Sequence, residues 1–436
     1  MTESKNLPHV DWLLGELPRL AALGLLSPEA AEALRRYYAA QRGAAPVSRL
    51  IPLVCALLGS LLIGSGVLLL IAHNWDDLGH AVRAVLSFAP LGLATVVSAF
   101  VLARRAGSAA WREGAAVFQV LAFGASISLV SQTYHISGDF PAFLLAWLLT
   151  SLPLVYLFRS TGAALLCAIG ATVRIGACAA GDTAAFLTLN WLFLALVVPH
   201  LVLLLRAGHR GAAAWLLWTL GLCLPVFLGV QAGQVKGHIW MVAFSGLFAA
   251  YSLLSIRPVF QGQGDSLWLN PLRVLGALGL AGFSLALTYK GTLREVSSLP
   301  VLSASPGLAI CLLFPLAALG LAIPGRKGAV HLLAGLFPVA AAAAWALASH
   351  DRLGAALIAT NGYVFAMGVA VLADGFRRDR LFHVNAGMAL LAVLIVSRFF
   401  DSDLGFVVRG VADILVGIGF LAVNFLFLKQ RKARAS

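Results

Sequence analysis

Four clusters of polar side chains adjoin long apolar segments, and they hold the residue types from which a functional site is built. They are residues 73–77 (HNWDD), 132–139 (QTYHISGD), 350–352 (HDR) and 398–403 (RFFDSD). Imidazole and carboxylate groups can exchange protons or bind a metal ion, and amide groups can hydrogen-bond a small molecule. His135 and Asp139 form such a pair, but a hydrolase or metal site would need a third partner that the spacing does not supply.

These clusters have two interpretations. Trp and Tyr are common where a helix leaves a membrane, and short polar side chains often cap helices, so each cluster can be an ordinary helix end. Alternatively, the clusters meet on one membrane face and form a shared binding pocket, in which Arg398 pairs with an acid from another span. The candidate binding residues of that pocket are Asn74, Trp75, Asp76, Gln132, Tyr134, His135, Asp139, Arg398 and Asp401.

Three further charged candidates lie inside apolar segments, where an unpaired charge is costly. Arg409 and Asp413 have the i, i+4 spacing that places two side chains on one face of a helix, so we expect them to pair. The pair is either a structural ion pair or a substrate or proton site in the outer half of the membrane. Arg174 has a side chain long enough to extend its charge to the membrane boundary.

The composition explains why these charges stand out. The 436-residue chain is 60% hydrophobic and 11% charged, with a mean hydropathy of +0.91. A soluble domain carries about 25% charged residues, so an integral membrane protein is the class that fits. Apolar segments close to the roughly 20 residues that cross a bilayer recur along the chain. They are residues 50–72, 83–103, 115–134, 140–158, 161–180, 184–205, 212–232, 238–256, 269–289, 306–323, 328–349, 354–373, 381–398 and 405–428.

The Lys and Arg residues indicate how these segments are oriented. If the N-terminus is cytoplasmic, most of the 31 basic residues fall in the N-terminal region, the even-numbered connections and the C-terminal tail. This positive-inside bias predicts an even number of spans and both termini in the cytoplasm. It also explains the net charge of +13 without nucleic-acid binding. The predicted fold class is an all-α polytopic membrane helix bundle of about 14 transmembrane helices, N-in and C-in. The outer clusters then belong to the first, third, eleventh and thirteenth spans, and we expect the ends of the first, third and thirteenth to meet.

The predicted domains are a cytoplasmic helical head (residues 1–48), a transmembrane domain (49–428) and a basic cytoplasmic tail (429–436). In the head, Gly24 is expected to end a first helix, and Ser27-Pro28 is typical of the N-cap and first residue of a second helix. The head either packs on the membrane domain or docks a protein partner.

Polar and small residues inside the spans are expected to connect helices. Gln119 and Asn190 should hydrogen-bond between helices, and Gly276, Gly279 and Gly282 should let helices approach closely. The five cysteines lie within apolar segments and lack metal-binding or disulfide spacing, so no metal and no cofactor is predicted. The motifs HExxH, GxSxG and Walker A do not occur in the sequence, which makes an enzyme the less favoured class.

Several stretches resemble a known bacterial family. They are Gly24-Leu25-Leu26-Ser27 in the head, Ala72-His73-Asn74-Trp75-Asp76 after the first span and Ser131-Gln132-Thr133-Tyr134-His135 after the third. These stretches are similar to the membrane proteins catalogued as domain of unknown function 2157, over about residues 10–158, and Arg398-Phe399-Phe400-Asp401 is similar as well. The resemblance implies a bacterial multi-pass inner-membrane protein with a cytoplasmic N-terminal segment. It implies no activity, so no catalytic residue is carried over.

Three functions are compatible with these features. The number of spans and the ionisable residues in the outer half of the membrane favour a transporter or flippase for a small molecule or a lipid-linked substrate. The first alternative is a non-transporting membrane scaffold or envelope sensor whose head docks a partner. The second is an intramembrane enzyme that uses the outer His and Asp residues. Each of them places the chain in the lipid bilayer of the bacterial inner membrane.

Overall fold

The computed structural model of the chain describes residues 16–18, 20–21, 23–41, 78–178, 184–235, 238–260, 267–295, 306–323 and 328–401, with short pieces between 410 and 425. These residues form helices and the turns between them, and no strand occurs among them. The predicted all-α fold class is therefore confirmed for the described part of the chain.

The helices follow one another with short connections. They are α2 (Pro28–Gln41), α4 (His80–Arg104), α5 (Ala109–Tyr134), α6 (Phe140–Leu157), α7 (Thr161–Cys178), α8 (Ala184–Arg206), α9 (Arg210–Gln234), α10 (Trp240–Leu254), α11 (Pro271–Ala286), α12 (Lys290–Glu295), α13 (Pro306–Ala322), α14 (Ala329–Ser349), α15 (Leu353–Arg377) and α16 (Leu381–Asp401). A short 3₁₀ turn, η2 (Leu267–Leu269), precedes α11. The short helix α12 lies in what the sequence predicts to be a connection.

The chain forms two compact units, Met1–Arg83 and Ala84–Ser436. In the first unit α2 begins as predicted, because the Ser27 Oγ accepts a hydrogen bond from the Ala30 backbone N–H at 3.2 Å and so caps the helix. Gly24 has a φ of +67°, a left-handed conformation that glycine adopts at little cost where a helix ends. The predicted domain boundaries near residues 48 and 428 lie outside the described residues and stay predictions.

Among the described residues, eight helices are long and apolar enough to cross a membrane. They are His80–Arg104, Ala109–Tyr134, Phe140–Leu157, Thr161–Cys178, Arg210–Gln234, Ala329–Ser349, Leu353–Arg377 and Leu381–Arg398. The shorter apolar helices are Asn190–Arg206, Trp240–Leu254, Pro271–Ala286 and Pro306–Ala322. Together these helices correspond to the second through thirteenth predicted spans. The first, 50–72, lies outside the described residues and the last, 405–428, is described only in pieces, so the count of 14 stays a prediction.

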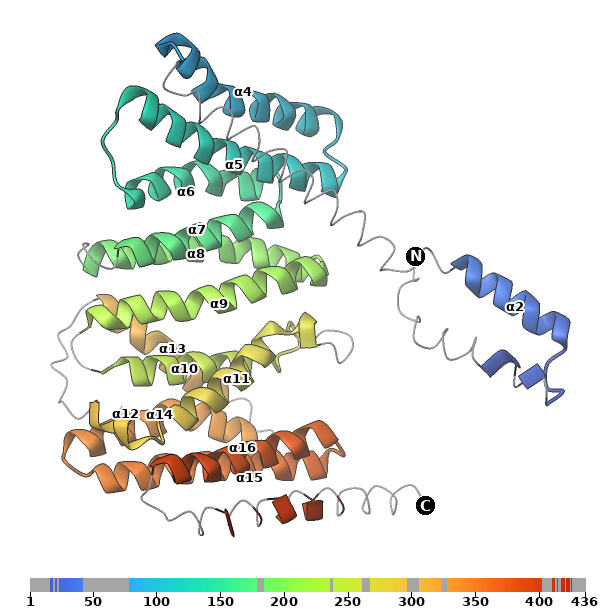
Figure 1. Ribbon diagram of the computed structural model, residues 1–436, viewed down its shortest axis with the longest axis vertical. Coiled ribbons are helices and arrows are strands. Elements are labelled where there is room, and N and C mark those ends of the chain that lie inside the picture. The colour runs from blue at the N-terminus through green and yellow to red at the C-terminus, as the bar shows by residue number, and fades with distance from the viewer. Residues whose placement is uncertain are drawn as a thin grey trace. The chain divides into compact units, whose positions relative to one another are not determined.

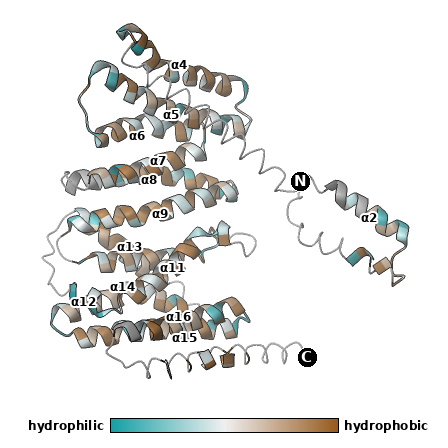
Figure 2. Cartoon of the chain, viewed as in Figure 1, coloured by the Kyte–Doolittle hydropathy of each residue, from teal (hydrophilic) through white to brown (hydrophobic). Residues whose placement is uncertain are grey.

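Within the second unit the helices lie side by side, roughly in chain order, from α4 at one end to α15 and α16 at the other (Figure 1). The order folds back where α10 packs against α9, α11, α13 and α14. Hydrophobic residues run along the helix bodies, and hydrophilic residues gather near the connections (Figure 2). A continuous hydrophobic core joins α4 to α15, and its largest fully buried side chains include Phe158, Phe227 and Phe337. At one end of this core, α4 approaches its neighbours less closely than the later helices approach theirs.

Two of the three glycines predicted to allow close helix packing do so in the structure. A Cβ added at Gly276 of α11 would lie 2.5 Å from the Ser252 backbone N of α10, and one added at Gly279 would overlap the Phe248 ring. The prediction is wrong for Gly282, where an added Cβ would meet nothing within 4 Å. The reason is that Gly282 is exposed and lies about 120° around the helix from Gly276, so it faces away from α10.

We expect Gly276→Ala to lower the free energy of unfolding by about 1–3 kcal/mol, because the new methyl group would force apart two backbones that are in contact. Gly282→Ala, on the same helix, is the matched control and should be neutral or slightly stabilising, since alanine is the better helix former. Thermal unfolding of the purified protein in detergent measures both changes. Equal melting temperatures for the two variants would contradict the close approach of α10 and α11.

Candidate functional site

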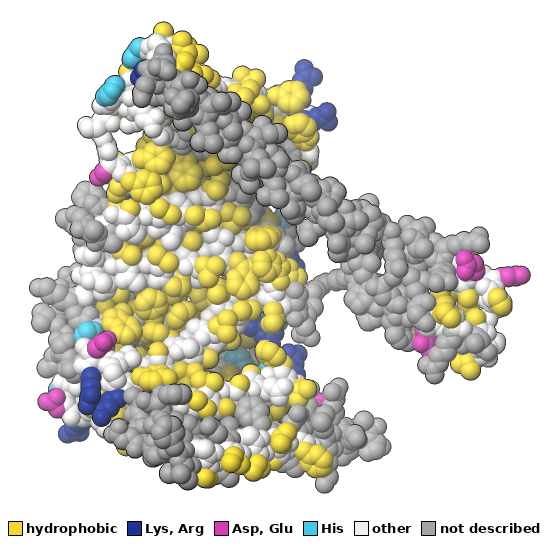
Figure 3. All heavy atoms as spheres, in the orientation of Figure 1, with side chains coloured by type: hydrophobic (Ala, Val, Ile, Leu, Met, Phe, Trp, Pro, Cys, Tyr) yellow, Lys and Arg dark blue, Asp and Glu magenta, His cyan; other side chains and the backbone are white. Residues whose placement is uncertain are grey.

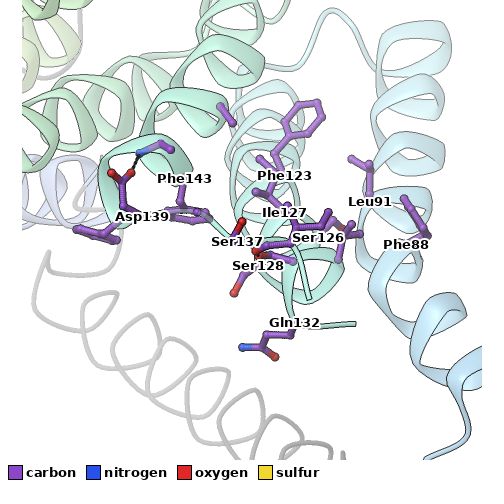
Figure 4. Close-up of a pocket in the computed structure, with 17 residues that line it drawn as sticks. Phe88, Leu91, Phe123, Ser126, Ile127, Ser128, Gln132, Ser137, Asp139 and Phe143 are labelled. Carbon is purple, nitrogen blue, oxygen red and sulfur yellow. Dashed lines mark hydrogen bonds between the residues drawn. The ribbon is translucent and has the colours of Figure 1, made fainter. Parts of the chain in front are cut away.

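A pocket of about 700 Å³ lies between α4, the C-terminal part of α5 and the start of α6 (Figure 4). Its apolar wall includes Phe88, Leu91, Phe123, Ile127, Phe140 and Phe143. Its polar side chains are Ser126, Ser128, Ser131, Gln132, Ser137 and Asp139. Two of the residues predicted from sequence to bind a ligand, Gln132 and Asp139, therefore line one pocket.

Side-chain hydrogen bonds hold α4 and α5 together at two levels. At one level the Ser98 Oγ donates to the Gln119 Oε1 at 3.0 Å, and the Gln119 Nε2 donates to the Thr95 Oγ1 at 3.3 Å. At the other level, nearer the end of α5, the Ser87 and Thr133 hydroxyls are 2.8 Å apart. The predicted interhelical role of Gln119 is thus confirmed. The pocket residues of the two helices fall between these levels, so polar contacts above and below keep the space open between them.

The turn from α5 to α6 fixes the rim of the pocket. His135 ends α5 in a left-handed conformation with a φ of 52°, and the Ser131 Oγ donates to the Ile136 carbonyl at 2.9 Å. Asp139 then caps α6, because its Oδ1 accepts a hydrogen bond from the Ala142 backbone N–H at 2.7 Å. These short-range bonds fix the turn between Gln132 and Asp139, which both line the pocket.

Ser126 brings an unused hydroxyl to the pocket. Its side chain is only 3% exposed, and its Oγ has no hydrogen-bond partner. A buried hydroxyl without a partner costs free energy, which a ligand acceptor in the pocket would recover. The sequence offered no signal for this residue, because serine in a membrane helix commonly bonds to its own backbone.

The other predicted residues of this cluster take different positions. Tyr134 is 47% exposed, and neither it nor His135 lines the pocket. His135 acts through its backbone as the end of α5, which agrees with the helix-cap interpretation. The 350–352 cluster likewise forms the turn between α14 and α15, with Asp351 at a φ of 57°.

Several predicted residues cannot be placed in a site. Asn74, Trp75, Asp76, Arg409 and Asp413 lie outside the described residues, as does the side chain of Asp401. The expected ion pair of Arg409 with Asp413 therefore stays a prediction.

The expected meeting of the third and thirteenth spans is wrong. The end of α5 lies at one end of the helix array and α16 at the other (Figure 1). The Arg398 Nη2 donates to the Thr288 Oγ1 at 2.9 Å, and its guanidinium lies 5.4 Å from the centre of the Tyr289 ring. Helices that stack in chain order bring each polar end to its immediate neighbours, so similar residue types do not imply a shared site. The predicted pairing of Arg398 with an acid stays a prediction.

Arg174 is buried inside the helix array, where its guanidinium bonds to neighbouring helices. It is 8% exposed, its Nε donates to the Pro141 carbonyl at 3.2 Å, and its Nη1 donates to the Asn190 Oδ1. The predicted interhelical role of Asn190 is therefore confirmed. Arg174 connects α7 to α8 and to the first turn of α6, so it helps to position the α6 wall of the pocket.

The sequence prediction missed Glu113, which connects α5 to the start of α7. Its Oε1 accepts from the Thr161 backbone N–H at 2.7 Å, and its Oε2 accepts from the Gly162 N–H at 2.9 Å and from the Ser160 hydroxyl. A carboxylate is favoured at this position because a helix N-terminus presents free N–H groups and a partial positive charge. The sequence did contain one signal for this contact, because Glu113 is a single acidic residue near the start of a long apolar helix.

We expect Glu113→Ala to lower the free energy of unfolding by about 1–3 kcal/mol, because several buried donors would lose their acceptor. Glu113→Gln keeps an amide oxygen in place as an acceptor and should lower the free energy of unfolding by less. Glu295→Ala, which removes an exposed acid at the end of α12, is the control and should change little. Thermal unfolding in detergent gives the order, and a Glu113→Ala protein as stable as the control would show that the contact contributes nothing.

No group of three His, Cys, Asp or Glu side chains in the described part of the chain is placed to hold a metal ion. The four cysteines that the structure describes, Cys167, Cys178, Cys223 and Cys311, are buried within helices, as the sequence predicts. The groups that the pocket offers are therefore hydroxyls, an amide and one carboxylate beside an apolar wall. Such a set can bind and orient an amphiphilic molecule.

One family model matches the part of the chain that contains the pocket. A family model described as "Predicted membrane protein (DUF2157)" matches residues 18–164, which include α4, α5 and α6. This confirms the resemblance inferred from the sequence over that segment, and with the apolar helices it makes the chain a membrane protein. No curated protein and no solved structure matches the chain.

Proposed function

We propose that the chain is a multi-pass protein of the bacterial inner membrane that binds an amphiphilic, lipid-like substrate in this pocket and moves it as a transporter or flippase. The observation that carries the proposal is the pocket itself, with an aromatic and aliphatic wall and a polar rim. Its volume lies within the range of about 300–1,000 Å³ that is usual for small-molecule sites.

The surroundings of the pocket support a substrate that comes from the membrane. On α4, Val85, Leu93 and Val96 are exposed, and hydrophobic side chains cover much of the visible face of the second unit (Figure 3). Exposed apolar surface of this extent is typical of contact with lipid. A lipid-like molecule could therefore reach the space between α4 and α6 without crossing water.

The proposed topology has 14 spans with both termini in the cytoplasm. The alternation of basic residues supports it, and so do the helices that run back and forth through the second unit. Reporter fusions in the 104–112 connection and at the C-terminus should both report cytoplasm, while a fusion within 291–304 should report periplasm. A C-terminus that reports periplasm would exclude an even number of spans.

The transport proposal predicts that filling the pocket stops movement of lipid. Ala142 lines the pocket, and Ala142→Phe should lower translocation of a fluorescent phospholipid about tenfold, a loss of about 1.4 kcal/mol. Ala89→Phe makes the same change at an exposed α4 position outside the pocket lining, and it should leave the rate unchanged. The measurement is chemical quenching of labelled phospholipid in liposomes that contain the purified full-length chain. Translocation no faster than in protein-free liposomes would exclude the flippase.

A non-transporting scaffold or envelope sensor is the second candidate. The continuous hydrophobic core from α4 to α15 favours it, because a solidly packed array is suited to holding a fixed shape. In that case residues 1–48 would dock a protein partner, and the pocket would sense a lipid. Binding of lipid that depends on the pocket, without translocation, would identify this function.

A further inference from the structure

The pocket carries one sign of charge. Asp139 is the charged side chain among the residues that line it, and the other polar groups there are hydroxyls and an amide. We propose that the pocket selects amphiphiles whose headgroup carries an ammonium group, in preference to those with an anionic headgroup alone. This inference rests on the proposed function, since it names the class of substrate that the same pocket takes.

Asp139 is placed to receive a cation. One of its oxygens, Oδ1, is occupied by the Ala142 N–H, and no residue in the described part of the chain pairs with its other oxygen. The capping bond holds the carboxylate at the start of α6, where Asp139 lines the pocket. Its side chain is exposed, so the attraction for a cation is modest but independent of any movement of the protein.

The buried cation that contacts the first turn of α6 does not line the pocket. Arg174 contacts the first turn of α6, but it is buried, it donates to Pro141 and Asn190, and it is not part of the pocket lining. An anionic headgroup would therefore meet a carboxylate, with no basic side chain among the described residues that line the pocket to offset the repulsion.

Ser126 supplies a second point of recognition, deeper in the pocket. It precedes Gln132 on α5 by less than two helical turns, which corresponds to about 9 Å along the helix. Its unpartnered hydroxyl can donate to a carbonyl oxygen. A glycerophospholipid with an ethanolamine headgroup has both features, an ammonium group at its polar end and ester carbonyls nearer its acyl chains. In this arrangement Asp139 determines the headgroup, and Ser126 contributes to the binding of any such lipid.

The test compares phosphatidylethanolamine with phosphatidylglycerol of identical acyl chains, added to the delipidated full-length protein in detergent and counted by native mass spectrometry. The wild-type protein should bind phosphatidylethanolamine about fivefold more tightly. Asp139→Asn should remove this preference, because asparagine caps a helix as well as aspartate does but carries no charge.

Ser126→Ala should weaken the binding of both lipids by about threefold and leave the preference for phosphatidylethanolamine intact. Ser151→Ala is the matched control: Ser151 is also buried with an Oγ that lacks a partner, but it lies on α6 outside the pocket lining. This control should bind both lipids like the wild type.

Two kinds of failure are distinguishable. Equal binding of the two lipids by the wild type, or a preference that survives Asp139→Asn, overturns the headgroup selection and leaves the pocket as a lipid site. Lipid binding that is insensitive to both Ser126→Ala and Ala142→Phe overturns the pocket as a lipid site, and with it the proposed function. That second result is also expected if another part of this chain fills the pocket.

Discussion

A polypeptide in hydrocarbon must satisfy its peptide N–H and C=O groups internally, and the described structure follows from this constraint. The helix bodies meet it through their own hydrogen bonds, so the remaining difficulty is at the helix ends. There the chain uses three different solutions. His135 turns the backbone into a left-handed conformation, Asp139 caps its own helix, and Glu113 caps the start of a helix two places further along the chain. Each solution also determines where a neighbouring helix lies.

The pocket results from the way α4 is attached. Hydrophobic contact between helices gives little drive inside a membrane, because lipid is as apolar as the side chains. Polar contacts therefore carry much of the association between α4 and α5, through Gln119 at one level and Ser87 with Thr133 at another. Large residues such as Phe88 and Phe123 occupy the interval and line a space that they do not fill. A helix held at two points can leave a cavity that a uniformly packed interface would close.

The sequence predicted what depends on local pattern. Hydropathy located the apolar helices that correspond to the second through thirteenth predicted spans, and cap chemistry located the start of α2 at Ser27. The sequence also identified Gln132 and Asp139 as candidate binding residues, but it did not predict that α4 forms the other wall of their pocket. What depends on which helices are neighbours was not predictable from one sequence. The alternation of basic residues predicted one membrane face for Arg398 and Gln132, and their polar character led us to expect contact, but packing in chain order separates them. Ser126 and Glu113 acquire their roles from tertiary contacts alone.

The rim of the pocket is more strongly determined than its body. The Arg174 guanidinium is expensive to bury, and it is tolerated because the Pro141 carbonyl and the Asn190 side chain accept its hydrogen bonds. Since Pro141 belongs to the first turn of α6, that cost also fixes the turn on which Asp139 stands. The Asp139 carboxylate is thus fixed by its own capping bond, and the helical turn that carries it is fixed by the buried Arg174. Groups fixed in this way discriminate between ligands by charge and position, because they cannot rearrange to suit a poorer match.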